Sequence, residues 1–67
     1  MGYFERQADG RIVYHNETGV AEVVMYAVAV DAGDNELGRV PARHWQTLGS
    51  KYGRAIREGR IALVGRK

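Results

Sequence analysis

The stretch VAEVVMYAVAVD, residues 20–31, decides the fold of this 67-residue chain. Apolar side chains occupy both its even and its odd positions, and its valines favour a strand because branched side chains are restricted in a helix. A strand that is apolar on both faces is central in its sheet, or is covered on its second face by a helix or a subunit. The competing interpretation is a helix, which the alanines, Glu22 and Met25 would tolerate. We expect residues 20–31 to form one central strand.

Shorter strands are expected on both sides of this stretch. Residues 3–7 and 11–15 flank Ala-Asp-Gly, which has the composition of a tight hairpin turn because glycine accepts a positive φ. Turn-forming residues also precede and follow the central stretch, at 16–19 and 32–35. A further short strand at residues 36–40 would stop at Pro41.

Residues 41–58 predict one amphipathic helix. Proline suits its first turn, and Gly59 suits its end. Five apolar residues at helical spacing make a single stripe, namely Trp45, Leu48, Tyr52, Ala55 and Ile56. Gly49 and Gly53 lie within the helix; we favour a strip of small residues, completed by Ala42, that allows close packing, and the alternative is a bend near Gly49.

After the helix, residues 60–64 predict a last strand, followed by a basic tail. The chain therefore belongs to the α+β class: a small, mainly antiparallel sheet of three to five strands with one amphipathic helix packed across it, in the order β-β-β-(β)-α-β. Residues 1–67 form one domain. A chain this short buries only about 60% of its unfolded surface, and it has no cysteine for disulfides. A homodimer is the remaining means of adding stability.

Charge is divided between the two halves of the chain. Residues 1–36 carry two basic and seven acidic side chains, whereas residues 37–67 carry eight basic side chains and one acid, Glu58. The halves therefore have formal charges of −5 and +7, which sum to the +2 of the whole chain. This asymmetry predicts a basic surface with a polyanionic or acidic partner.

The cations of the predicted helix gather on the side opposite its apolar stripe. These candidate binding residues are Arg43, Lys51, Arg54 and Arg57. Arginine favours bidentate contacts with phosphate or carboxylate groups, so the helix face is a candidate for nucleic-acid binding. Four flanking cations would extend the contact along a phosphate backbone, namely Arg39, Arg60, Arg66 and Lys67. The alternative is a solvated face that pairs with the acids of the first half.

The residues give no indication of catalysis or of a metal site. His15 and His44 are not paired by sequence with a nucleophile, and no activating motif surrounds Ser50, the only serine. The acidic loop at residues 31–36 lacks the ligand order of a calcium loop, which favours an ordinary polar turn. Phosphate-loop and dinucleotide-binding motifs are missing. We expect a protein that is not an enzyme and that uses no cofactor or metal.

Two further patterns concern location and core. The longest apolar run, residues 23–30, is too short to span a bilayer, and the start of the chain does not resemble a secretory signal. With no cysteine, the composition fits a cytoplasmic protein. The strand aromatics Tyr3, Phe4, Tyr14 and Tyr26 are expected in the core under the helix, although an exposed sheet face could use them to stack bases or to anchor a protein.

Residues 36–41 (ELGRVP), the Leu48-Gly49 pair and residues 58–64 (EGRIALV) resemble the AbrB/MazE type of swapped-hairpin DNA-binding domain. That family has a Gly-Arg strand, a proline-led short helix ending in Leu-Gly, and a final Gly-Arg-Ile strand. The resemblance implies that Arg39, Arg43 and Arg54 lie near DNA. Residues 49–59 depart from it, because they are short for the family's middle strand and continue the helical stripe, so we assign the chain to no family.

The leading functional hypothesis is a small non-catalytic binding module whose arginine-rich helix face contacts nucleic acid. The alternative is a protein–protein interaction module, such as a small microbial or phage-type inhibitor or adaptor. It would use the basic half on an acidic partner or the acidic half on a basic one. A third hypothesis is a structural homo-oligomer in which a second copy covers the apolar strand.

Overall fold

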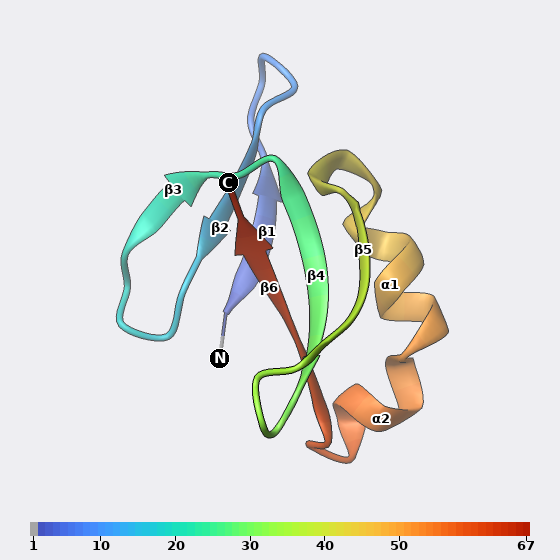
Figure 1. Cartoon of the computed structure of the whole chain (residues 1–67). Helices are drawn as coiled ribbons and strands as arrows, with labels where there is room; N and C mark the ends of the chain where they lie inside the picture. Colours follow the sequence, from blue (N-terminus) through green and yellow to red (C-terminus); the bar gives the residue numbers. More distant parts are fainter. Residues whose placement is uncertain (1) are drawn as a thin grey trace.

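The computed structural model describes residues 2–67, which form six antiparallel strands in two three-stranded sheets (Figure 1). The strands are β1 (Tyr3–Arg6), β2 (Ile12–His15), β3 (Ala21–Val23), β4 (Tyr26–Asp31), β5 (Glu36–Pro41) and β6 (Ile61–Arg66). Between β5 and β6 lie a 3₁₀ turn, η1 (Ala42–His44), and two helices, α1 (Trp45–Lys51) and α2 (Gly53–Arg57). The strand orders are β1-β2-β3 and β5-β4-β6. The predicted α+β class, the antiparallel pairing and the helix before the last strand are confirmed.

The predicted central strand at residues 20–31 is in fact two strands that belong to different sheets. Val24 still donates its N–H to Ile12 of the first sheet, whereas Met25 donates to the carbonyl of Arg66 in the second. Because the chain changes sheets between these two residues, only β4 is central, and β3 is an exposed edge strand. The prediction of one strand is therefore wrong for this stretch, and the single sheet that it implied is replaced by two.

The helical segment also differs from the prediction at its start and in its middle. Pro41 ends β5 with a ψ of 143°, so helical geometry begins only at the next residue. Tyr52, with φ −110° and ψ 15°, separates α1 from α2, which places the break three residues after Gly49. A Cβ on Gly49 would meet no atom within 4 Å, so the predicted close packing through this glycine is wrong. Gly59 ends α2 as predicted, with a φ of 77° and a Schellman hydrogen-bond pattern.

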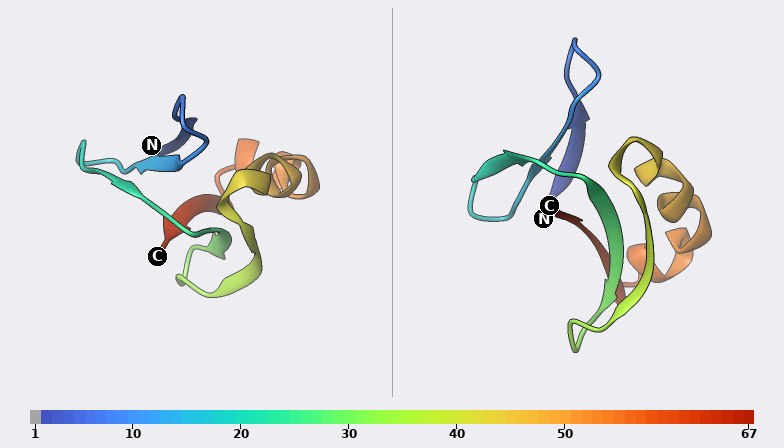
Figure 2. Two further views of the ribbon diagram at one scale, coloured as in Figure 1. Left: turned by 90° about the horizontal axis from the view of Figure 1, so that it is seen from above. Right: turned by 45° about the horizontal axis from the view of Figure 1, so that its top comes forward.

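The core lies between the helical segment, the β1-β2-β3 sheet and the inner face of the β5-β4-β6 sheet (Figure 2). On β4, Ala27 and Ala29 are fully buried, and their small side chains leave room for Leu48 of α1. Phe4 of β1 stacks on Trp45, with ring centroids 5.5 Å apart, and so joins the first sheet to the helix. The apolar stripe predicted for the helix therefore packs on the core as expected.

The first sheet packs closely against β6 at Gly65. A Cβ at this position would lie 2.6 Å from the Cβ of Tyr14 and 2.8 Å from Cγ1 of Val24. Glycine is required here because both neighbours are held by the backbone of the first sheet.

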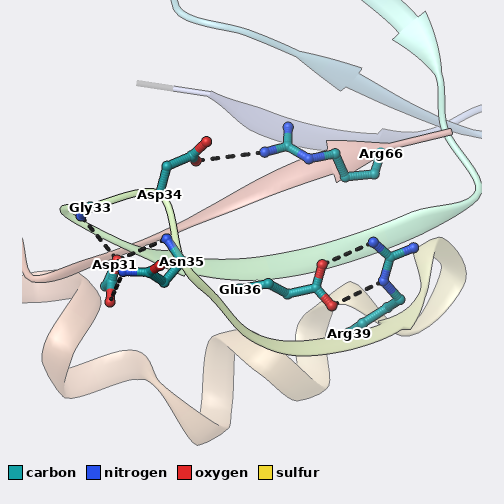
Figure 3. Close-up of polar contacts among 7 residues, drawn as sticks. All are labelled: Asp31, Gly33, Asp34, Asn35, Glu36, Arg39 and Arg66. Atoms are coloured by element: carbon teal, nitrogen blue, oxygen red, sulfur yellow. Dashed lines mark hydrogen bonds and ion pairs between the residues drawn. The ribbon is translucent and has the colours of Figure 1, made fainter.

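The outer face of the second sheet carries charged side chains over buried valines. Leu37 is an extra residue on β5 opposite the Ala29–Val30 step, and this bulge puts Glu36 and Arg39 on the same face. The two side chains form an ion pair of 2.9 Å, shown in Figure 3. Hydrogen bonding and charge from Arg39 lower the pKa of the Glu36 carboxyl.

Within residues 2–67, no helix is long and apolar enough to cross a membrane.

Candidate nucleic-acid interface

Four of the predicted binding residues lie on the exposed side of the helical segment, and we call this set the basic helix surface. It consists of Arg43 in η1, Lys51 in α1, and Arg54 and Arg57 in α2, all of which are exposed. Within residues 2–67, Arg43, Lys51 and Arg57 form no ion pair with an acidic side chain. The ammonium of Lys51 lies 5.4 Å from the ring centroid of Tyr52. These cations are therefore available to an external anion.

Glu58 is the acid that contacts this surface, and its carboxylate forms ion pairs with two arginines. Arg54 lies 3.6 Å from it and is 86% exposed, whereas Arg60 forms a closer pair at 2.6 Å. An exposed pair at 3.6 Å is worth little to stability. The basic helix surface therefore keeps a net positive charge, whereas Arg60, which directly precedes β6, is neutralised by Glu58.

The other predicted contacts lie elsewhere. Cross-strand register places Arg39 and Arg66 on the same sheet face as Val28, and this face is opposite to the one that carries the helix. Arg39 pairs with Glu36 and covers the ring of Tyr26, with its guanidinium 4.7 Å from the centroid.

Acids of the first half also neutralise the two cations at the end of β6. Arg66 lies 3.7 Å from Asp34 at the tip of the β4–β5 hairpin (Figure 3), and Lys67 lies 3.1 Å from Glu22 of β3. The eight predicted cations thus divide into three groups: Arg39, Arg66 and Lys67 each pair with an acid of the first half, Arg54 and Arg60 share Glu58, and within residues 2–67 Arg43, Lys51 and Arg57 have no acidic partner.

An apolar groove of about 610 Å³ lies between the first sheet and the helical segment, above the first half of β6. Its apolar lining includes Phe4, Tyr14, Trp45, Ile56, Ile61 and Leu63. Burial raises the pKa of the Tyr14 phenol. Its polar lining residues include Asp31 and Arg60, and each of these is already engaged within the chain.

A cluster on the outer face of the first sheet was missed by the sequence interpretation. Tyr3 is exposed, contrary to its expected place in the core, and stacks on His15 with ring centroids 4.3 Å apart. Nε2 of His15 lies 2.8 Å from the Glu5 carboxylate. The register of the predicted hairpin was the available signal, because it pairs Tyr3 with His15. Phe4 and Tyr14 do belong to the core.

The acidic loop forms a hydrogen-bonded turn (Figure 3). Oδ1 of Asp31 accepts hydrogen bonds from the backbone N–H groups of Gly33 and Asn35, each at 2.9 Å. These bonds, led by the one from Asn35, lower the pKa of Asp31. Asp34 takes a positive φ of 62°, which aspartate tolerates better than most residues. The carboxylates of this loop thus serve the turn and its ion pairs.

This turn predicts a pH dependence of stability. Because the pKa of Asp31 is lower in the folded state, its stabilising contribution is complete above the unfolded pKa and is lost as the pH falls through the folded value. The Asp31→Asn variant should therefore lose less stability than the wild type between pH 7 and pH 3, measured as the change in Tm. Glu17→Gln is the control, since Glu17 accepts no hydrogen bond within residues 2–67. Equal losses in wild type and Asp31→Asn would contradict this account.

With this geometry established, we compared the chain with models of protein families, with curated proteins and with solved structures, and none matches. The resemblance to swapped-hairpin domains is not supported by a family match, and residues 49–59 are largely helical where that family has a strand.

Proposed function

We propose that this protein is a small non-catalytic nucleic-acid-binding module that contacts the phosphate backbone with the basic helix surface. The observation that carries the proposal is the separation of charge. The sheet cations Arg39, Arg66 and Lys67 each have an acidic partner, whereas Arg43, Lys51 and Arg57 have none within residues 2–67. A surface on which three of four cations have no acidic partner within the described residues suits an external polyanion.

The dimensions of the surface favour a duplex. From Arg43 to Arg57 the segment advances at most about 21 Å, at roughly 1.5 Å per residue, which corresponds to about six base-pair steps. The aromatic residues of this segment, Trp45 and Tyr52, are half-buried against the core. The surface therefore offers charge without a stacking platform, and single-strand binding proteins normally use such a platform.

Four phosphate contacts predict a steep dependence on salt. With a slope of about −0.9 per contact, affinity for duplex DNA should fall by about 100-fold between 50 and 200 mM salt. The double variant Arg54→Glu, Arg57→Glu should reduce binding at 50 mM salt by at least 100-fold without lowering stability, because both residues are exposed. Fluorescence anisotropy with labelled duplex, single-stranded DNA and RNA measures this.

The matched control is Arg11→Glu, Arg66→Glu, which changes net charge equally but alters the β1–β2 turn and the outer sheet face. Binding that survives in the control and is lost in the helix variant supports the proposal. Equal losses would mean that net charge alone governs binding. No binding at 50 mM salt would refute the proposal and favour the alternative, an acidic protein that uses its carboxylates on the same arginines.

A further inference from the structure

The free edge of β3 exposes backbone groups that have no partner. Tyr14 and Glu22 form a hydrogen-bonded pair between β2 and β3, as do Asn16 with Val20 and Ile12 with Val24. In an antiparallel ladder the residues between such pairs direct their N–H and C=O groups to the other side. Ala21 and Val23 therefore present four backbone groups at the open edge, and no hydrogen bond within residues 2–67 uses them.

The side chains around this edge are apolar and exposed. Val23 is 44% exposed, and Val20 and Met25, on either side of β3, are 56% and 65% exposed. Edge strands are usually protected by lysine, proline or a bulge, because an exposed apolar edge pairs readily with another strand. β3 has no lysine, proline or bulge; its protection is limited to its length of three residues and to Glu22, which is already paired with Lys67.

The pattern of free groups is self-complementary. If a two-fold axis passes beside Glu22, Ala21 of one copy lies opposite Val23 of the other, and each such pair exchanges two hydrogen bonds. One antiparallel register thus satisfies all four groups in both copies. Val23 and Ala21 would then meet their counterparts on the outer face of the sheet across the dyad.

Charge at the edge supports the same occupant. The dyad would bring two Glu22 side chains together, and each already has Lys67 at 3.1 Å. Two carboxylates and two ammonium groups then alternate around the axis, so a second copy supplies its own neutralising charges. A foreign strand would need to provide an equivalent pattern.

We propose that β3 pairs with β3 of a second copy of this chain, forming a continuous six-stranded antiparallel sheet across a two-fold axis. This inference goes beyond the proposed function and does not depend on it. The residues of the basic helix surface take no part in the pairing.

Sedimentation equilibrium over a dilution series tests the pairing. The wild type should show twice the mass of one chain at high concentration and dissociate on dilution. Ala21→Pro should weaken the dimer at least tenfold, because it removes an outward N–H without touching the bonds to β2. Arg6→Pro is the control, since the register of β1 also directs the N–H of Arg6 away from β2, on the opposite edge of the sheet. A monomer at every concentration, or equal weakening by both prolines, would overturn the proposal.

Charge exchange gives an independent test that does not alter the backbone. Glu22→Lys should place four cations at the dyad and raise the dissociation constant of the dimer at least tenfold. Adding Lys67→Glu to this variant should restore the dimer. Within one chain the pair is exposed, so neither variant should change the Tm of the monomer appreciably. A dimer that is indifferent to the first change, or not rescued by the second, would show that another surface forms it.

Discussion

Replacing Gly65 with alanine should lower the free energy of unfolding by about 3 kcal/mol, enough to leave much of this small domain unfolded. The added Cβ would lie 2.6 Å from the Cβ of Tyr14 and 2.8 Å from Cγ1 of Val24. A Cβ has no rotamer with which to avoid a contact, and the Cβ of Tyr14 is equally fixed to its strand. The first sheet would have to move away from β6, which would also disturb the stacking of Phe4 on Trp45.

The same substitution at Gly49 should have the opposite effect on the free energy of unfolding. Gly49 lies within α1, and a Cβ there meets no atom within 4 Å, so alanine should stabilise the protein by about 0.5–1 kcal/mol. Denaturant unfolding followed by the fluorescence of Trp45, the only tryptophan, measures both variants. A Gly65→Ala variant as stable as the wild type would show that the two sheets do not meet closely at β6.

The parts of the fold that the sequence predicted depend on neighbours along the chain. The β1–β2 hairpin follows from a turn between two apolar runs, and the apolar face of α1 and α2 follows from spacings of three and four residues. The glycine end of α2 is similarly local, because Gly59 alone supplies the positive φ. The break at Tyr52 was not predicted, since the apolar stripe keeps its spacing across it.

The change of sheet at Val24–Met25 depends on partners that are distant in sequence. Met25 bonds to Arg66 and to Ala42, and nothing in residues 20–31 indicates either contact. An exposed edge strand and a buried central strand, placed end to end, give the same apolar composition as one two-sided strand. The pattern therefore correctly predicted strand structure in residues 20–31, but it wrongly predicted that the strand is continuous.

The candidate site also has features that neighbouring residues predict and features that depend on distant partners. Helical periodicity was enough to predict that Arg43, Lys51, Arg54 and Arg57 are exposed on the helical segment. The positions of Arg39 and Arg66 depend on the register of β5 and β6 against β4, and on the bulge at Leu37. Lys67 meets Glu22 only because the end of β6 lies beside the first sheet. Which cations are neutralised is thus a property of the tertiary structure.

Leu48→Ala is the second substitution with a large expected effect, a loss of about 2–5 kcal/mol in the free energy of unfolding. Leu48 is 4% exposed and belongs to the core cluster that also contains Ala27 and Ala29 of β4. Because the facing residues are alanines, no longer side chain can fill the space that truncation leaves. The helix would lose a buried contact with β4.

Leu37→Ala is the matched control, because Leu37 is 44% exposed in the β5 bulge and its truncation should cost less than about 1 kcal/mol. In chemical denaturation, the losses in unfolding free energy of the two variants should therefore differ by at least 1 kcal/mol. Equal losses would mean that α1 does not pack on β4 through Leu48.

Nucleic-acid binding should also weaken in Leu48→Ala, in proportion to the unfolded fraction, since the basic helix surface has the proposed spacing only on a folded core. Partial rescue of binding by Gly49→Ala in the Leu48→Ala background would link the two properties, because Gly49→Ala adds no charge and changes only stability.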